Sequence, residues 1–404
     1  MARFFPTKTE IKNFLQKIPE YFEAGYVLLR KSGAMEGKQY TDNGEPQSKK
    51  KCLGDENEEN NESKVEKIKK RNVALLLAYN GSNYYGMQVN CEYKTIESEL
   101  IQALYKSHSI PSNAVNDLHK IHFQRAARTD KGVSAARQIV SFKIAETFDI
   151  ENINSYLPND IRVFDIKRVT KGFNCKNQCC ARTYSYTLPT YALSPEFHKE
   201  YPINYRIDKD TLLKVNEILC RFLGTHNFHN FTARKDCRDP SAKRYIISFK
   251  TEEPFLDKEE FITIKVKGQS FMLHQIRKMV GYTIAVLKGF ASEDYQTNVW
   301  SSNKVSVPMA PGLGLILEDV HYDKYNRKFG NDGMHAALTW HEVNEKIENF
   351  RRENIIKNII NTETTERVMF QWLENFERHN FEIFEPEELQ KDEKELEGAK
   401  ELSI

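Results

Sequence analysis

The stretch of this 404-residue sequence that best indicates the fold is Ala127-Arg128-Thr129-Asp130-Lys131-Gly132-Val133-Ser134-Ala135. An Asp, a polar residue and a Gly in succession are ordinary turn chemistry between two strands. The segment that follows, Gln138 to Ile144, alternates Val140, Phe142 and Ile144 with smaller or polar residues, as a half-buried strand does. The stretch therefore predicts a turn that leads into a strand.

Strand and helix patterns alternate on both sides of this turn. Val73 to Tyr79 is a short apolar run before the turn signal Asn80-Gly81-Ser82-Asn83, and Thr95 is a suitable N-cap for a helix. Further strands are expected at Arg182–Leu188, Phe261–Lys267 and Leu315–Val320, and further helices after Asp208, over 271–289 and within 338–379. Because the strands alternate and helices lie between them, the sequence predicts an α+β protein with helices against an antiparallel sheet.

The composition is that of a soluble intracellular chain. Hydrophobic residues make up 40% and aromatic residues 11% of the sequence, so a sizeable core is expected despite long polar segments. No run approaches the roughly 18 apolar residues of a membrane-spanning helix, and the N-terminus lacks the apolar stretch of a secretory signal. Seven cysteines, an odd number, fit a reducing compartment. We therefore expect no membrane association.

The net charge of the whole chain is only +2, but the charges are unevenly distributed, and the chain outside two polar segments is basic. Residues 41–72 contain eight acids and eight bases, and residues 381–404 contain nine acids and three bases, a net of −6. Both segments are expected to be solvated or disordered. The rest of the chain then carries +8, which favours binding to a polyanion only weakly.

Asp130 is the single acid in a thirteen-residue stretch with four bases, Arg125, Arg128, Lys131 and Arg137. Neighbouring guanidinium groups keep a carboxylate ionised, which suits a nucleophile or an electrostatic stabiliser better than a general acid. From the residues alone, an ordinary turn and a catalytic carboxylate both remain open.

The helix expected over 271–289 places Arg277 at the edge of its apolar arc. A guanidinium in that position must extend to solvent or meet a carboxylate, because burying it alone is costly. Asp130 is a candidate partner. His274 and Lys278 lie outside the arc and are expected to face solvent or phosphate.

Tyr184 and Tyr186 share one sheet face with Arg182 in the expected strand. An aromatic pair of this kind usually packs in the core or across strands. In a site that handles a nucleobase it provides a stacking surface instead.

Metal and nucleotide signatures are weak. Cys175, Cys179 and Cys180 lie close together, and His226 and His229 precede Cys237, but no CxxC pair accompanies them. The sequence has neither a GxGxxG nor a GxxxxGK[ST] motif. We therefore expect no metal and no nucleotide cofactor.

Taken together, these motifs resemble the TruA-type tRNA pseudouridine synthases, most closely their eukaryotic nuclear branch, over roughly residues 72–322. The most specific piece is Arg128 to Ala135, which looks like the catalytic loop of that family. Four other pieces follow the family's order: Tyr79 to Gln88, in which Met87 stands where tryptophan is usual; Arg182-Thr183-Tyr184; His274 to Gly281; and Gly314 to Leu317.

The resemblance implies two ferredoxin-like halves that form a central mixed or antiparallel sheet with flanking helices and an RNA-binding cleft. The expected parts are an N-terminal extension over 1–71, a catalytic half over 72–190, a second half over 191–330, and a helical C-terminal extension with an acidic tail over 331–404.

The resemblance also implies the reaction: a uridine loses its N1–C1′ bond, the uracil rotates, and C5 is joined to the sugar. No redox step occurs, so no cofactor is expected. By resemblance, Asp130 starts the reaction, Arg277 pairs with it, and Tyr184 stacks on the uracil, with Leu315 or Leu317 closing the other side.

Further residues are expected to contact RNA. Arg128 is the candidate to support the space that an extruded nucleotide leaves. The phosphate contacts are expected from basic residues along the chain, namely Arg125, Lys131, Arg137, Arg182, Lys243 and Arg244.

The expected partner is tRNA, modified in or near the anticodon stem and loop, with small nuclear and messenger RNA as further substrates. Lys49-Lys50-Lys51 and Lys69-Lys70-Arg71 are weak nuclear signals, and a mitochondrial address is less favoured because the first twenty residues include Glu10 and Glu20. The oligomeric state stays open. Two alternatives are a non-catalytic RNA-binding or chaperone protein on the same fold and a metal-dependent nuclease that uses Asp130.

Overall fold

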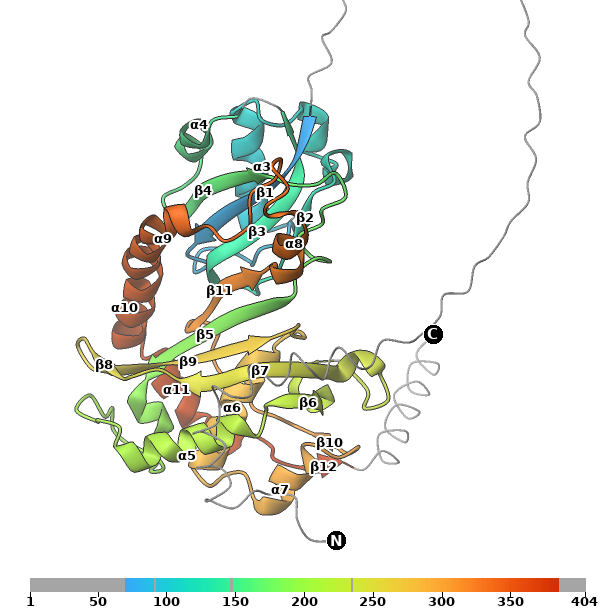
Figure 1. Ribbon diagram of the computed structural model, residues 1–404. Helices are drawn as coiled ribbons and strands as arrows, with labels where there is room; N and C mark the ends of the chain where they lie inside the picture. The colour runs from blue at the N-terminus through green and yellow to red at the C-terminus, as the bar shows by residue number, and fades with distance from the viewer. Residues whose placement is uncertain (1–69, 91, 146–147, 234, 385–404) are drawn as a thin grey trace, which may run out of the picture. The chain divides into compact units, whose positions relative to one another are not determined.

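The computed structural model of the protein describes residues 70–90, 92–145, 148–233 and 235–384 (Figure 1). The N-terminal extension expected over 1–71 lies outside the described residues except for its last two, which begin a strand. Lys49-Lys50-Lys51 and the acidic tail beyond residue 384 lie outside them as well.

In the described part of the chain, ten strands form one mixed sheet, in the order β4-β1-β3-β11-β5-β9-β7-β6 with β2 beside β3 and β8 beside β9. The strands in chain order are β1 Lys70–Tyr79, β2 Gln124–Arg125, β3 Ser134–Ala145, β4 Ile161–Arg168, β5 Ala181–Pro189, β6 Gly224–Asn227, β7 Lys243–Thr251, β8 Phe255–Leu256, β9 Glu260–Gly268 and β11 Leu315–His321. A separate pair joins β10 Lys304–Val305 to β12 Ile383–Phe384. The predicted α+β class with a central mixed sheet is confirmed.

Two segments of the chain repeat one order of elements. The first is β1, α3 (Ile96–Lys106), β2, β3, α4 (Ile150–Ser155) and β4, and its strands lie in the order β4-β1-β3-β2. The second is β5, α5 (Lys209–Cys220), β7, β9, α6 (Gln275–Leu287) and β11, and its strands lie in the order β11-β5-β9-β7. Neighbouring strands within each segment are antiparallel.

β11 joins the two segments (Figure 1). It pairs parallel to β3 over two positions, Ile316 with Ser134 and Leu317 with Ala135. On its other side it runs antiparallel to β5, and Leu317 there faces Tyr184. The start of β3, which follows the Asp130 turn, is thus brought beside β5.

Local sequence signals set several boundaries. Thr95 caps α3 in a capping box with Ser98, and Asp208 caps α5 by accepting from Thr211 N at 2.8 Å. The helix expected from residue 271 begins only at Gln275. The cause is His274, whose φ of 63° is left-handed and cannot continue a right-handed helix.

The C-terminal helices cover the sheet face that carries Ala78, Ala136 and Ile316. They are α9 (Asn344–Phe350), a π-helical turn (Arg351–Ile356), α10 (Lys357–Glu366) and α11 (Val368–Glu374), preceded by α7 (Glu293–Asn298) and α8 (Asp323–Phe329). Phe350, Ile355 and Ile359 pack on that face. No helix among the described residues is long and apolar enough to cross a bilayer.

A buried ion pair fastens this cover. Arg351 donates from Nη2 and Nε to the carboxylate of Glu318 on β11, at 2.6 and 2.9 Å, and Ser185 of β5 donates to the same carboxylate at 2.5 Å. Beside it, Arg137 of β3 pairs with Glu348 of α9 at 2.8 Å. The segment from α9 through the π-helical turn is therefore bonded directly to β11 and β3, and through Glu318 to β5.

Glu363 of α10 predicts a pH dependence of stability. Burial raises its pKa to about 7, although it accepts from Met369 N at 2.8 Å and from Tyr191 Oη at 3.2 Å. The folded protein therefore retains a proton that the unfolded chain releases near pH 4.5, so stability falls as the pH rises from about 4.5 to 7.

The variant Glu363→Gln cannot ionise and should be more stable than wild type at pH 8 by up to about 3 kcal/mol, and equal to it near pH 4.5. Urea unfolding at both pH values measures this. Glu366→Gln, an exposed change on the same helix, is the control. Equal stability of wild type and Glu363→Gln at pH 8 would contradict the prediction.

Candidate active site

Asp130 lies in a closed turn at the start of β3. Val133 N donates to Asp130 O at 3.1 Å, and Gly132 takes a φ of 77°, which favours glycine. The turn predicted from the sequence is therefore present, and it holds the carboxylate about one quarter exposed, at 27%.

Side chains of β1 and β3 hold the residues just before Asp130 in place. The buried amide of Gln138 accepts from Ala127 N at 3.2 Å and donates to Ala127 O at 2.9 Å. Tyr79 Oη and Thr129 Oγ1 are 2.9 Å apart and hydrogen-bonded. These buried contacts leave the backbone on that side little freedom.

The segment after β1 fastens the other side. Met87 N donates to Thr129 O at 3.1 Å, and Gly132 N donates to Tyr84 O at 3.1 Å. Gly86, with a φ of 91°, permits this approach, since a Cβ there would lie 2.6 Å from Thr129 O. Asp130 is therefore presented by a loop held from both sides.

His274 is the side chain that faces the carboxylate. Its Nε2 lies 3.8 Å from Asp130 Oδ2. The left-handed backbone that delays the start of α6 sets this direction, and Thr232 Oγ1 holds the preceding carbonyl, Leu273 O, at 2.9 Å. The expectation that His274 faces solvent or phosphate missed this contact. Helical periodicity misplaced the residue because it lies outside the helix.

Arg277 lies beside the same loop but does not form the expected ion pair in the described structure. Its Nε donates to Ala310 O at 2.7 Å. A Cβ on Gly312 would lie 3.8 Å from Arg277 Cζ and 3.6 Å from Lys131 O, so the guanidinium and the loop flank this glycine. Within the described residues Nε is the guanidinium nitrogen that is hydrogen-bonded, which leaves the two Nη groups available for a ligand or for Asp130.

Tyr184 completes the group from β5. Its ring meets Phe271 edge-on at 5.3 Å between centroids, and its strand partner in β11 is Leu317. Burial raises the pKa of Tyr184, and the charge of Asp130 is among the smaller effects in the same direction. Leu317 is fully buried while Leu315 keeps 6% exposure, so Leu315 is the better placed of the two to meet a ligand.

Two of the predicted phosphate contacts are scaffold residues. Arg125 Nη2 pairs with Glu97 Oε1 at 2.6 Å, and the Glu97 side chain is fully buried. Arg182 donates from Nε and Nη2 to Ala126 O at 3.0 and 2.6 Å. Both guanidiniums meet protein oxygens near the Asp130 loop, which favours a role in holding the loop over the predicted contacts with phosphate.

The remaining basic residues differ in place. Arg128 and Lys131 are exposed beside Asp130 and have no carboxylate partner among the described residues. Lys243 and Arg244 begin β7, two strands beyond β5, and Arg244 donates to Lys243 O at 3.2 Å. The structure thus brings the first pair to the site and leaves the second pair away from it. Arg137, paired with Glu348, is engaged with α9.

Metal-ligating side chains do not cluster in the described residues, and one thiol is deeply buried. No group of three or more His, Cys, Asp or Glu residues within the described ranges is arranged to hold a metal ion. Cys175 is buried, which raises the pKa of its thiol to about 12 and disfavours the reactive thiolate.

Comparisons with known proteins agree with one another. A family model described as tRNA pseudouridine synthase matches residues 218–323. Pseudouridylate synthase 1 homolog of Mus musculus is 49% identical over 337 residues, covering 82% of this chain and 79% of the mouse protein. The Homo sapiens protein of the same name is 52% identical over 314 residues, covering 76% and 74%. tRNA pseudouridine synthase 1 of Kluyveromyces lactis is 33% identical over 393 residues, covering 77% and 71%.

The scaffold role of Arg125 is testable by stability. Arg125→Ala leaves the buried Glu97 carboxylate without its cation and should lower the free energy of unfolding by about 3 kcal/mol. The double variant Arg125→Ala/Glu97→Gln should recover much of the loss, while Arg128→Ala, an exposed change, should cost little. Urea unfolding of the four proteins measures this. An unchanged stability in Arg125→Ala, with weaker RNA binding, would return Arg125 to the phosphate contacts.

Proposed function

This chain belongs to the tRNA pseudouridine synthase family and is an isomerase, and on that premise we propose that Asp130 is the carboxylate that starts its reaction on uridines of tRNA. The observation that carries the proposal is the Asp130 loop itself. It is tied by Gln138, Tyr79 and Met87, and His274 faces it from the residue just before α6. Arg277 of α6 and Tyr184 of β5 lie nearby.

The chemistry requires a fixed, ionised carboxylate. The N1–C1′ bond breaks, the uracil turns while detached, and C5 forms the new bond to C1′, with a proton lost from C5 and one gained at N1. Asp130 acts by attack on the sugar or the base, or by taking a proton from the sugar. Each route benefits when the loop holds the carboxylate without reorganisation.

Neighbouring side chains hold the uracil, support the RNA and orient Asp130. Tyr184 stacks on the uracil and keeps it captive, and Leu315 closes the other side. Arg128, exposed beside the carboxylate, supports the space left by the extruded nucleotide. The free Nη groups of Arg277 hold Asp130 or the adjacent phosphate once RNA is bound, since hydrogen bonds of an empty site often tighten only with substrate.

The architecture of the proposal is a pair of ferredoxin-like halves with an RNA-binding cleft between them. It is supported by the repeated β-α-β-β-α-β order and by the matching strand orders on the two sides of β11. Asp130 precedes β3 of the first repeat, and Tyr184 lies on β5, the first strand of the second repeat. The proposed boundaries, near residues 190 and 330, fall after β5 and after α8, so the first boundary leaves β5 with the catalytic half.

Finer points extend the same proposal. The substrates are uridines in or near the anticodon stem and loop of tRNA, with small nuclear and messenger RNA as further substrates, and the protein acts in the nucleus. The yeast relative carries tRNA in its name. The two short basic clusters of the sequence support the nuclear location.

The deciding experiment incubates the purified full chain with unmodified tRNA transcripts, chelator present and no cofactor added. Pseudouridine is mapped by a chemical adduct that stops primer extension. Wild type should give site-specific stops, and Asp130→Asn should give none while binding tRNA within about threefold of wild-type affinity. Asp257→Asn, a change in an exposed turn, is the matched control. Stops that persist in Asp130→Asn would remove the residue from its role, and tight binding without any stops would favour a binding protein.

His274 generates a second prediction. His274→Gly removes the ring while keeping the left-handed backbone at no steric cost, so stability should hold and kcat should fall by about tenfold or more. Added imidazole should restore part of the rate. His108→Gly is the matched control because His108 has the same backbone conformation, with a φ of 58°, on the exposed surface. A wild-type kcat in His274→Gly would mean that the contact with Asp130 has no part in turnover.

A further inference from the structure

Two exposed tyrosine rings lie stacked beside the Asp130 loop. The ring centroids of Tyr85 and Tyr93 are 4.2 Å apart and the ring planes differ by 15°. Tyr85 is 47% and Tyr93 is 43% exposed. Single exposed aromatic residues are common on protein surfaces, but a parallel stacked pair left open to solvent presents a flat surface of the shape and size of a base.

The backbone holds the two rings together. Tyr85 N donates to Lys94 O at 2.9 Å, and Ile96 N donates to Gly86 O at 3.2 Å. These bonds close the intervening loop at its base, which is where Tyr85 and Tyr93 lie. A ligand that stacks there meets rings whose positions are already fixed, so little ordering is needed on binding.

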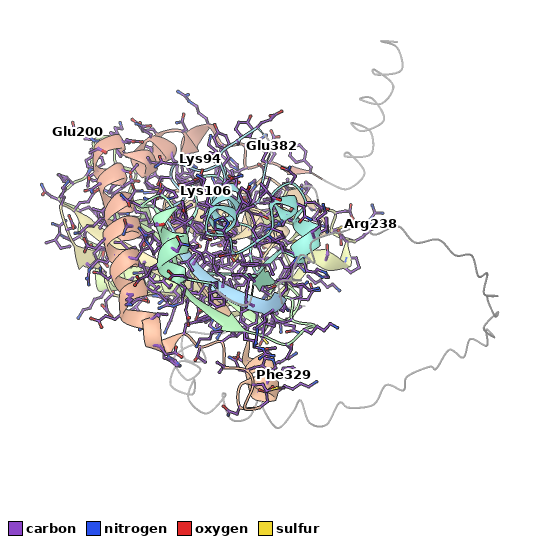
Figure 2. All side chains as sticks on the ribbon, turned by 90° about the horizontal axis from the view of Figure 1, so that it is seen from above. Lys94, Lys106, Glu200, Arg238, Phe329 and Glu382 are labelled. Carbon is purple, nitrogen blue, oxygen red and sulfur yellow. The ribbon has the colours of Figure 1, made fainter. Side chains whose placement is uncertain are left out.

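One lysine lies against the pair, and a second lies over the neighbouring Tyr84 ring. Lys131 Nζ lies 4.1 Å from the centroid of Tyr85, and Lys94, labelled in Figure 2, lies 4.9 Å from the centroid of Tyr84. Since Tyr93 covers one face of Tyr85 and Lys131 the other, the outer face of Tyr93 is the one left for a further ring. Lys94 also faces Glu99 at 3.9 Å, whereas Lys131 has no carboxylate partner in the described residues.

The stacked pair is continuous with the active site. Lys131 follows Asp130 directly in the chain, and Gly132 N donates to Tyr84 O at 3.1 Å, next to Tyr85. One lysine side chain therefore separates the proposed nucleophile from the rings. Extruding a uridine disturbs the stacking of its neighbours, whose bases then need new surfaces.

We propose that Tyr85 and Tyr93 form a stacking platform for an unpaired base of the substrate RNA close to the target uridine. The inference rests on the proposed function and adds to it a binding site outside the catalytic group. A base is the occupant that this surface fits: it is flat and aromatic on its open face, and Lys131, which lies against the other ring, supplies a positive charge for a phosphate nearby. Stacking tolerates any base, so the platform supports several sites of modification.

The test is a cycle of protein and RNA changes. Tyr93→Leu removes the open ring, Tyr93→Trp keeps a stacking surface, and Tyr105→Leu, a 41% exposed tyrosine on α3, is the matched control. Abasic residues replace one nucleotide at a time through a tRNA stem-loop that wild type binds. The Kd is measured for every pair, and kcat/KM as well where turnover occurs.

Tyr93→Leu should weaken RNA binding by about 5- to 100-fold, Tyr93→Trp should bind as wild type, and Tyr105→Leu should change nothing. At one nucleotide position the abasic RNA should cost wild type a similar factor and cost Tyr93→Leu almost nothing. That loss of additivity identifies the stacked base.

Two results would overturn the platform: wild-type affinity in Tyr93→Leu, or additive losses at every nucleotide position. Both are read from binding and hold whether or not the protein turns over. Absence of pseudouridine with wild type, together with a non-additive cycle, would instead overturn the proposed catalysis and keep the platform. No RNA binding by wild type would overturn both.

Discussion

The pairing of β11 with two strands that run in opposite directions is the constraint on which the site depends. Parallel hydrogen bonds to β3 and antiparallel ones to β5 fix the distance between β3 of the first segment and β5 of the second. Asp130, just ahead of β3, and Tyr184, on β5, are brought together through this strand, and Arg182 of β5 adds a tie by donating to Ala126 O. Arg351, bonded to Glu318 of β11, adds a tie from the C-terminal helices. A change in β11 would therefore alter the positions of both Asp130 and Tyr184.

Much of the charge around Asp130 serves to hold its loop. The guanidinium of Arg125 pairs with Glu97, and that of Arg182 donates to Ala126 O, both next to the loop. Burying an arginine is costly unless its donors are satisfied, so these contacts also fix the backbone that they meet. Arg128 and Lys131, by contrast, are exposed, and these are the cations that we propose for contact with RNA. An arginine that contacts the protein, Arg125, and one that we propose for RNA, Arg128, thus lie three positions apart, and they differ in how far their side chains are exposed.

Patterns of short range predicted β1, β3, β5, β9 and β11, but neither β4 nor β7. The alternation of Val140, Phe142 and Ile144 marked β3, and the polar caps Thr95 and Asp208 marked two helix starts, because such signals act between residues a few positions apart. The same reasoning failed at His274. His274 has a left-handed backbone, which interrupts helical periodicity. The neighbouring residues in the sequence do not indicate that Thr232 bonds to Leu273 O or that His274 faces Asp130.

By itself the sequence determined the α+β class, the family and the identity of Asp130, Tyr184 and Arg277 as candidate residues, since ordered motifs and local periodicity suffice for these. Only the tertiary structure decided that His274 faces the carboxylate, that Arg277 Nε bonds to Ala310 O, and that Tyr85 stacks on Tyr93. The physical reason is that these contacts depend on backbone direction and burial. Both arise from pairings between distant segments, above all through β11, which local residue patterns do not encode.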